Sequence, residues 1–331
     1  MRQSPLLDLF HARGATLADY RGSLTWNGHP SGNLAPPPPR LWDASWRAVL
    51  RASGADARKW LNGMISANVA ALEPGGWAPS FQLDPKGHVL ALLDIACTGE
   101  QEFLLFCDEE ARADLLARLQ RFVFISKVTL ADESESWGAL RLNGDGARAA
   151  WSAAQLEVAA PEPGHVSAPA ADLAFALGSA QGLEFWGHPE AVRRAWERLQ
   201  SHATPGDAGE QEHLRILAAE PRYGADITAA DLPQETGELA RLDFRKGCYV
   251  GQEIVERIRA RGAVHRHLRA LRFTAPVVAG ATLSIAGAVV GKLTSVAPRE
   301  GEWRALGYVR DPHGAPGTEL QANDAGGAVL P

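Results

Sequence analysis

The stretch Arg245-Lys246-Gly247-Cys248-Tyr249-Val250-Gly251-Gln252-Glu253 is the most informative part of this chain. It holds one of three cysteines, two glycines four residues apart, and two cations before the thiol. Glycine adopts backbone conformations closed to other residues and lets a ligand approach closely, and a cation near a cysteine favours the reactive thiolate. The alternative is a buried, inert cysteine between turn glycines. Because polar residues crowd the motif and disfavour a core position, the pattern indicates a functional thiol at Cys248.

The length and composition are those of an ordinary globular protein. A chain of 331 residues is long enough for two or three domains, and 46% hydrophobic with 22% charged residues excludes disordered and fibrous classes. No apolar run approaches the roughly 18 residues of a membrane span, and Leu6-Leu7 is followed at once by Asp8, which is not typical of a signal peptide. The cysteines have no C-x-x-C spacing, which disfavours a disulfide framework or a zinc site. We therefore expect a cytoplasmic, reduced protein with no membrane partner.

The charge is distributed unevenly along the chain. Between Arg245 and Arg272 there are eight Lys/Arg and two acids, a local balance of 8 − 2 = +6, so the net charge of −6 leaves −12 for the remainder. A basic segment on an acidic protein suggests an anionic ligand or partner. Pairing of these arginines with nearby acids is the alternative. Transfer RNA is a weakly supported partner, because few aromatic residues lie among the arginines and no RNA-binding motif is present.

The glycine-rich segment Gly144-Asp145-Gly146-Ala147-Arg148-Ala149 matches the dinucleotide-binding pattern G-x-G-x-x-A. A Rossmann unit also needs a buried strand that ends in an acid some 20 residues later. The chain there reads Pro161-Glu162-Pro163-Gly164 instead. We interpret the segment as a turn between a strand and a helix.

Periodicity and turn residues predict an α+β protein, in which helices alternate with strand hairpins. The patterns predict one strand over residues 42–51, a helix that begins in a capping box at residues 53–56, and an extended segment over residues 123–130. Residues 254–260 fit a helix or a strand equally well. From residue 268 to the end, short strands alternate with Gly/Pro turns, which is typical of a small β-barrel.

With these residues in view, the chain resembles the folate-binding YgfZ family, relatives of the aminomethyltransferase (T-protein) of the glycine cleavage system. The strongest match is the segment 246–253 to the family signature K-G-C-[FY]-x-G-Q-E. Supporting matches follow in the family's order: Gly54-x-Asp56-Ala57, Pro85-Lys86-Gly87, Gly182-x-Glu184, Pro221-Arg222-Tyr223-Gly224 and Leu232-Pro233-Gln234-Glu235. The resemblance therefore spans nearly the whole chain.

This resemblance implies a T-protein-like cloverleaf of three lobes around a central channel. Residues 1–250 would form the folate-binding region, as two interleaved α+β lobes with the chain crossing between them near residues 125–135. Residues 255–331 would form the C-terminal β-barrel domain.

The resemblance also implies a site for tetrahydrofolate. By motif match, Glu184 would help to hold the pterin, since a carboxylate accepts N–H donors; a solvated acid at a strand end is the alternative. Cys248 and Lys246 are the implied catalytic residues. The other implied folate contacts are Arg222, Tyr223, Glu235, Gly247, Tyr249, Gly251 and Gln252.

Members of the cysteine-bearing branch assist the assembly or repair of iron–sulfur enzymes, including enzymes that modify transfer RNA. A thiolate is a soft, redox-active ligand that suits contact with a cluster, but clusters usually take four protein ligands. The resemblance thus implies a folate-binding accessory protein that acts transiently on iron–sulfur client proteins and holds no stably bound metal.

One departure from the family pattern bears on enzyme activity. Aminomethyltransferases carry an acidic pair shortly after the Lys-Gly turn, whereas this chain has Ala91 and Leu92 there. Apolar side chains transfer no protons, so we expect no glycine-cleavage activity unless Asp94 substitutes. A folate-dependent one-carbon transferase of the T-protein type stays open as the alternative function.

Overall fold

The computed structural model describes residues 1–12, 15–21, 23–27, 39–167, 174–179, 182–262 and 264–331. The chain divides into two compact units. Unit 1 comprises Met1–Ser80 and Leu92–Gln211, and unit 2 comprises Phe81–Ala91 and Glu212–Pro331. The expected boundary between a region 1–250 and a domain 255–331 stays a prediction. Among the described residues, no helix is both long enough and apolar enough to cross a bilayer.

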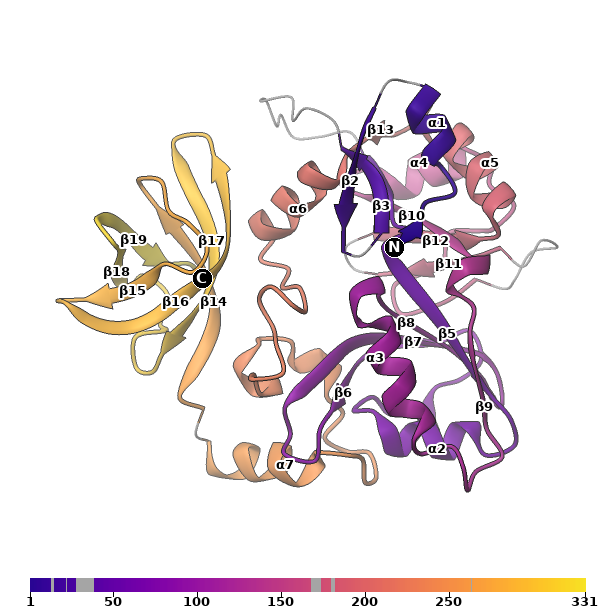
Figure 1. Ribbon diagram of the computed structural model, residues 1–331, viewed down its shortest axis with the longest axis horizontal. Helices are drawn as coiled ribbons and strands as arrows, with labels where there is room; N and C mark the ends of the chain where they lie inside the picture. Colours follow the sequence, from indigo (N-terminus) through magenta and orange to yellow (C-terminus); the bar gives the residue numbers. More distant parts are fainter. Residues whose placement is uncertain (13–14, 22, 28–38, 168–173, 180–181, 263) are drawn as a thin grey trace. The chain divides into compact units, whose positions relative to one another are not determined.

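Unit 1 contains two five-stranded sheets (Figure 1). One has the order β11-β12-β10-β4-β13, and the strands are β4 (Arg40–Asp43), β10 (Gly138–Asn143), β11 (Phe175–Gly178), β12 (Gly182–Gly187) and β13 (Thr204–Pro205). The other has the order β6-β7-β8-β5-β9, and the strands are β5 (Arg47–Ser53), β6 (Trp77–Leu83), β7 (Val89–Gly99), β8 (Glu102–Asp108) and β9 (Thr129–Asp132). The end of the β6–β7 hairpin belongs to unit 2.

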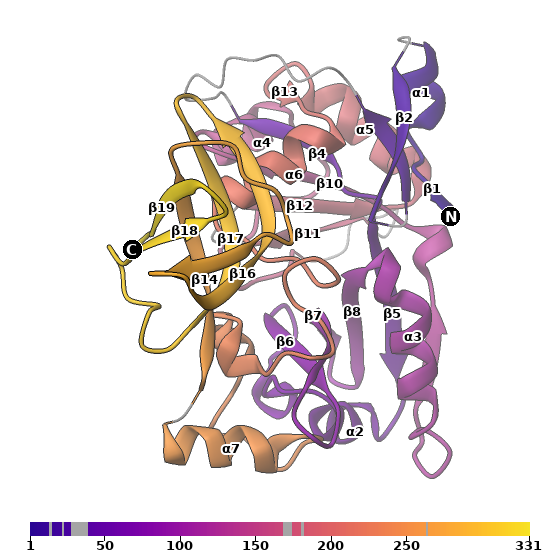
Figure 2. The same ribbon diagram turned by 60° about the vertical axis from the view of Figure 1, so that its left-hand side comes forward.

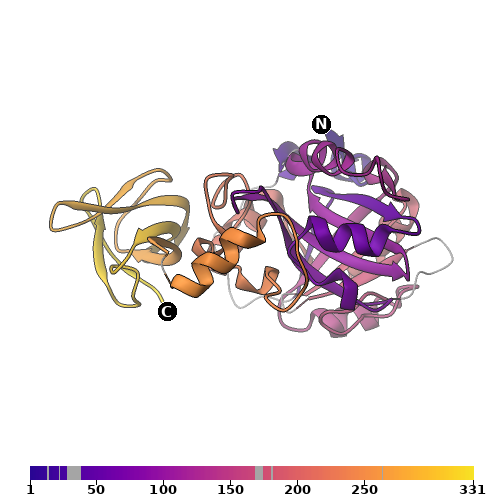
Figure 3. The ribbon, with the colours of Figure 1, turned by 90° about the horizontal axis from the view of Figure 1, so that it is seen from below.

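Alternation of side chains along the strands builds two cores in unit 1. On β10, Leu140 and Leu142 join one hydrophobic cluster, whereas Ala139 joins another. The second cluster also holds Val49 and Phe106 of the other sheet, so the two sheets pack face to face. Helices cover the outer faces: α4 (Ala147–Ala153) and α5 (Pro189–Leu199) lie on β10 and β12, while α2 (Ala57–Met64) and α3 (Glu109–Gln120) lie on β5 and β8 (Figure 3).

Shorter elements complete unit 1. The N-terminal residues form a three-stranded sheet of order β1-β3-β2 and a short helix, and the 3₁₀ turns η1 and η2 follow later in the chain. Their bounds are β1 (Arg2–Gln3), α1 (Leu7–Ala12), β2 (Thr16–Tyr20), β3 (Ser23–Asn27), η1 (Val69–Ala71) and η2 (Ser134–Ser136).

Unit 2 combines helical segments with the predicted barrel (Figure 2). Helix α6 (Ala208–Leu217) begins in unit 1 and continues into unit 2, where η3 (Pro233–Glu235), η4 (Leu239–Arg241) and α7 (Gln252–Arg261) follow. The closed barrel has the order β14-β17-β16-β15-β18-β19, and the strands are β14 (Arg266–Phe273), β15 (Thr282–Ile285), β16 (Ala288–Arg299), β17 (Glu302–Arg310), β18 (Glu319–Ala322) and β19 (Ala325–Val329). The α+β class and the C-terminal barrel are confirmed.

Three local predictions from the sequence were wrong. The single strand over residues 42–51 is divided between β4 and β5, because the carboxylate of Asp43 accepts hydrogen bonds from the N–H (3.1 Å) and hydroxyl (2.6 Å) of Ser45 and turns the chain. Asp56 does not cap α2, since its carboxylate accepts the N–H of Lys127 at 2.8 Å. The extended segment over 123–130 is a turn up to residue 126, and β9 begins only at Thr129.

Residues 254–260, whose pattern fits a helix or a strand equally well, belong to helix α7. Gly251 precedes it with φ +84° and Gly262 follows it with φ +68°, so a left-handed glycine stands at each end. The Gly144–Ala149 segment is the predicted turn between a strand and a helix, since it joins β10 to α4.

Candidate functional site

The thiol of Cys248 is exposed, on the loop that leads into α7. Asp243 begins the loop, and its Oδ1 accepts the backbone N–H groups of Arg245 (2.7 Å) and Lys246 (3.1 Å). Gln252 Oε1 accepts the N–H of Tyr249 at 3.3 Å at the other end. Hydrogen bonds on both sides therefore fix the loop that presents the thiol.

Gly251 of the motif around Cys248 and Gly87 of the Pro85-Lys86-Gly87 motif pack closely together within unit 2. A Cβ on Gly251 would lie 2.6 Å from the carbonyl oxygen of Asp84, in the β6–β7 turn. A Cβ on Gly87 of that same turn would lie 2.9 Å from Cβ of Ile254 in α7. The Pro85-Lys86-Gly87 motif therefore packs against the start of α7, only four residues beyond Cys248 (Figure 1). Glycine is needed at these positions because two backbones approach closely.

The β6–β7 turn carries a histidine that the sequence analysis missed. Asp84 Oδ1 accepts the N–H groups of Lys86 and His88, both at 2.8 Å, and Asp84 Oδ2 lies 3.0 Å from His88 Nδ1. Burial alone would raise the pKa of Asp84, but the hydrogen bonds from His88 outweigh it and the pKa is lowered. An aspartate four residues before a histidine across a Pro-Lys-Gly turn is the signal that could have revealed this pair.

Lys246 is buried rather than solvated. Its Nζ lies 4.9 Å from the ring centroid of Tyr249. Burial lowers the pKa of Lys246 to about 7, and the charge of Asp243 opposes this only in part. The fixed cation expected beside the thiol is therefore an amine that titrates near neutral pH.

Two buried polar atoms lie near this loop without a partner among the residues that the structure describes. They are the hydroxyl of Tyr249 and Oε1 of Gln234. Burial and, next, the charges of Glu256 and Asp243 raise the pKa of Tyr249 to about 12. The amide nitrogen of Gln234 donates to the carbonyl oxygen of Val255 in α7 at 2.9 Å. Buried polar atoms without partners are costly, so a ligand or water that bonded to them would be stabilised.

The remaining predicted contacts of unit 2 are engaged by the chain itself. Glu235 accepts Arg266 Nε at 2.9 Å and the N–H of Leu232 at 3.0 Å. The backbone N–H of Arg222 donates to Asp226 at 3.0 Å. Tyr223 is half-buried and forms an isolated β-bridge with Ile227. Gly247 is exposed, and a Cβ there would meet no heavy atom within 4 Å.

Glu184 belongs to unit 1, where it is buried on β12. Its Oε2 accepts Trp186 Nε1 at 3.1 Å, while its Oε1 lies 3.4 Å from Arg47 Nη1 and 3.9 Å from Arg141 Nε. The alternative of a solvated strand-end acid is therefore excluded, because the carboxylate is buried beside two cations. Arg47 was not predicted as a site residue, although an arginine inside the apolar run of β5 was a signal.

Arg47 links Glu184 to a second acid. Its Nη2 donates to Asp94 Oδ2 at 2.6 Å. Burial alone would lower the pKa of Arg47, but Glu184 and Asp94 outweigh it and the pKa is raised. Asp94, the acid that was considered as a substitute for the missing pair, is thus held in a largely buried ion pair.

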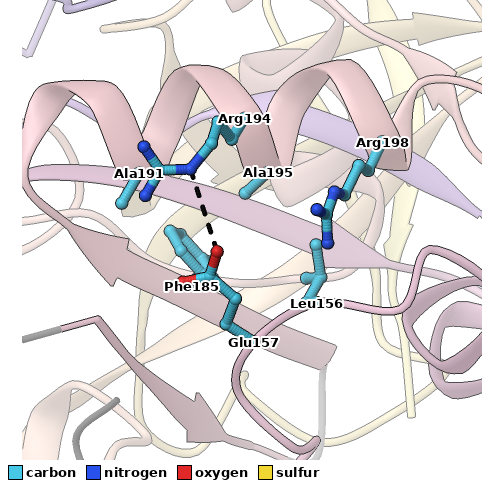
Figure 4. A pocket seen from close by; sticks show the side chains of 7 residues that line it. All are labelled: Leu156, Glu157, Phe185, Ala191, Arg194, Ala195 and Arg198. Carbon is cyan, nitrogen blue, oxygen red and sulfur yellow. Dashed lines mark ion pairs between the residues drawn. The ribbon is translucent and has the colours of Figure 1, made fainter. Parts of the chain in front are cut away.

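Unit 1 also has a hollow of about 240 Å³, open to solvent, beside α5 (Figure 4). Arg194 Nε lies 3.8 Å from Glu157 Oε1 across it. It is lined by Leu156, Glu157, Phe185, Ala191, Arg194, Ala195 and Arg198. Successive side chains of a strand point to opposite faces, so Phe185 faces this hollow and Glu184 faces away from it. None of the predicted site residues lines the hollow.

Comparisons with known proteins agree with this fold. The GCVT N-terminal domain model matches residues 40–246. An aminomethyltransferase of Saccharopolyspora erythraea is 26% identical, over 99% of this chain and 95% of that protein. A tRNA-modifying protein YgfZ of Escherichia coli is 28% identical, over 71% of this chain and 76% of that protein.

The glycine cleavage system aminomethyltransferase T of Bartonella henselae has a similar structure. Its crystal structure superposes with a TM-score of 0.90 at 21% identity, and the match covers 100% of this chain and 97% of that one. The T-protein-like fold implied by the sequence motifs is confirmed, while the roles assigned to individual residues stay predictions. The chain belongs to the GCVT-domain family.

Proposed function

We propose that this protein is a cytoplasmic, folate-binding accessory protein that helps iron–sulfur enzymes to acquire or regain their clusters, with Cys248 as the reacting thiol. The exposed thiol on a loop fixed at both ends carries the proposal. Membership of the GCVT-domain family and the similarity to proteins named tRNA-modifying protein YgfZ support it.

The residues of unit 1 fit a folate. An ionised carboxylate has about four lone-pair sites, and the contacts of Glu184 with Trp186 and Arg47 leave some of them for the N–H edge of a pterin. The side chain of Glu184 is 11% exposed, so a ligand can reach it. Arg47 and Arg141 would hold the carboxylate in a fixed orientation. Bound tetrahydrofolate would supply a reduced pterin that carries one-carbon units.

The loop in unit 2 offers two reactive groups. Cys248 can ligate iron transiently, or it can exchange with an oxidised sulfur of a client, so that one S–S bond forms as another breaks. One thiol is too few to hold a cluster, so the client must keep the remaining ligands. Lys246, with a pKa of about 7, has the near-neutral value that proton transfer at physiological pH requires.

An equilibrium titration tests the folate part of the proposal. Fluorescence quenching by tetrahydrofolate should saturate with the wild-type protein, and Glu184→Gln should weaken the affinity about tenfold or more, since a charged hydrogen bond contributes roughly 1.5–3 kcal/mol. Absence of saturable binding to any folate form would contradict the proposal that the protein binds folate.

A one-carbon transferase is the second candidate, because the similarity to an aminomethyltransferase covers 99% of this chain. The local chemistry disfavours it. Ala91 is buried and apolar, and the nearest acid on β7, Asp94, is held by Arg47 at 2.6 Å. Formation of methylenetetrahydrofolate from an amine donor by the purified protein would favour this candidate.

Direct binding of transfer RNA has less support than the sequence suggested. In the basic segment 245–272, Arg266 pairs with Asp231 at 2.8 Å and with Glu235 at 2.9 Å, and Arg259 pairs with Glu256 at 3.4 Å. These pairs reduce the charge that the segment presents to a polyanion.

A further inference from the structure

The loop between α3 and β9 presents large apolar side chains to solvent. It comprises residues 121–127 and is called the 121–127 loop below. Phe124 and Ile125 are each 82% exposed, and Phe122 is 50% exposed. Single exposed apolar residues are ordinary, whereas three within four positions form a patch of the kind that marks an interaction site.

The base of the 121–127 loop is fixed by the structure around it. Trp60 Nε1 donates to the carbonyl oxygen of Phe122 at 3.0 Å, and the N–H of Lys127 donates to Asp56 at 2.8 Å. A Cβ on Gly54 would lie 2.3 Å from the carbonyl oxygen of Lys127, so a backbone segment packs closely there. A loop held in this way loses little conformational entropy on binding.

Two cations flank the apolar tip. The side chains of Arg121 and Lys127 are exposed, and neither forms an ion pair with any described residue. The nearby acid Asp56 is occupied by the backbone of Lys127. The surface that complements the tip is therefore apolar at its centre and acidic at its rim.

The apolar tip and the flanking cations of the 121–127 loop favour some classes of binding partner over others. A second copy of the loop would bring like charges together. A bilayer needs more hydrocarbon, since even a whole myristoyl chain, at about 0.8 kcal/mol per CH₂, gives only marginal binding. RNA offers base faces that suit Phe124, but Ile125 has no ring to stack on them. A protein socket suits both side chains, because buried aromatic and arginine anchors dominate protein interfaces.

We propose that Phe124 and Ile125 dock in an acid-rimmed apolar socket of the iron–sulfur client protein. The inference rests on the proposed function, because that function supplies the client. Docking through this loop raises the local concentration of the client without taking part in the chemistry. Loss of the loop contacts should therefore raise the client concentration needed for half-maximal rate and leave the maximal rate unchanged.

The test uses the full chain and a peroxide-damaged, purified iron–sulfur enzyme of the tRNA-modifying class. The rate of restoration is measured against client concentration for wild type, Phe124→Ser/Ile125→Ser, and a matched control. The control is Val278→Ser/Val289→Ser in the barrel, where the residues are 63% and 54% exposed. The half-saturation concentration should rise at least tenfold for the loop variant and remain unchanged for the control.

A second variant tests the two cations that flank the apolar tip of the loop. Arg121→Glu/Lys127→Glu should raise the half-saturation concentration several-fold and abolish the slowing of association by added salt. Circular dichroism should show the wild-type fold for each variant, because every changed side chain is solvent-exposed.

An unchanged half-saturation concentration for the loop variant would overturn the inference. So would a loop variant that loses affinity for fluorescein-labelled transfer RNA or anionic vesicles while it binds the client normally. Biolayer interferometry with the immobilised client separates the two proposals. Wild-type protein that binds the client through the 121–127 loop without restoring its activity would support the docking inference and contradict the proposed function.

Discussion

Nη1 of Arg47 lies 3.4 Å from Oε1 of Glu184, and Nη2 of the same guanidinium lies 2.6 Å from Oδ2 of Asp94. Two strands of one sheet and one strand of the facing sheet thus meet at a single buried cation. The pterin-binding role proposed for Glu184 depends on this arrangement, because the guanidinium of Arg47 orients the carboxylate.

Replacement of Arg47 by methionine should be strongly destabilising. It removes the cation that links Asp94 to Glu184 and leaves Glu184 with Arg141 at 3.9 Å. Breaking a largely buried pair in this way costs roughly 3–5 kcal/mol. Urea unfolding followed by tryptophan fluorescence measures the loss. Arg51→Met on the same strand is the control, because its ion pairs are more exposed and should cost only about 1 kcal/mol. Equal losses for the two variants would mean that Arg47 has no special structural role.

The two glycines around Cys248 should respond differently to alanine. Gly251 has φ +84° and its Cβ would lie 2.6 Å from the carbonyl oxygen of Asp84, so Gly251→Ala should destabilise unit 2 by about 1–3 kcal/mol. Gly247→Ala should change stability by less than about 0.5 kcal/mol, since a Cβ there meets nothing within 4 Å. Thermal unfolding measures both. A Gly251→Ala variant with wild-type stability would show that the β6–β7 turn and α7 do not pack closely.

Lys246 should make stability depend on pH. Its pKa is about 7 in the folded protein and 10.5 in the unfolded chain, so between these values the unfolded state binds more protons and the free energy of unfolding rises with pH. The cost of burying the ammonium is therefore present below pH 7 and relieved as the pH approaches 10.5. Each unit of the shift corresponds to about 1.4 kcal/mol.

Lys246→Met removes this titration. Urea unfolding at pH 6.5, 7.5, 8.5 and 9.5 should show a rising free energy for wild type and a flatter profile for the variant, with the variant more stable at the lowest pH. Parallel profiles for the two proteins would contradict the burial of the amine.

The sequence predicted the fold well where the periodicity is strong. The strands of the C-terminal barrel, for example, alternate with Gly/Pro turns from residue 268 onward, as predicted. It failed where a side chain takes a distant backbone partner, as Asp56 does with Lys127, because that competition with helix capping cannot be seen locally.

The site was predictable only in part. The motif located the exposed thiol, but Glu184, which the collinear matches singled out, is buried inside strand β12 rather than solvated at a strand end. The contacts of Glu184 with Arg47, and of Gly251 with Asp84, join residues far apart in sequence, so no local pattern indicates them. Burial of Lys246 was hidden for another reason: a lysine among polar neighbours is normally solvated.

Thiol labelling should distinguish Cys248 from the other cysteines. Cys97 and Cys107 are buried, and burial raises the pKa of Cys107. In the native protein, one equivalent of Ellman's reagent should react quickly, and this reaction should disappear in Cys248→Ala. Rapid reaction of two or three thiols in the native wild type would show that the buried cysteines are accessible.

The most direct measurement of the central claim is restoration of a peroxide-damaged iron–sulfur enzyme by wild type and by Cys248→Ala, each saturated with tetrahydrofolate. Matched unfolding curves for the two proteins would confirm that the substitution leaves the fold intact. The account predicts that wild type restores activity and that Cys248→Ala restores no more than buffer with folate. Equal restoration by the two proteins would contradict it, because the thiol would then have no part in the reaction.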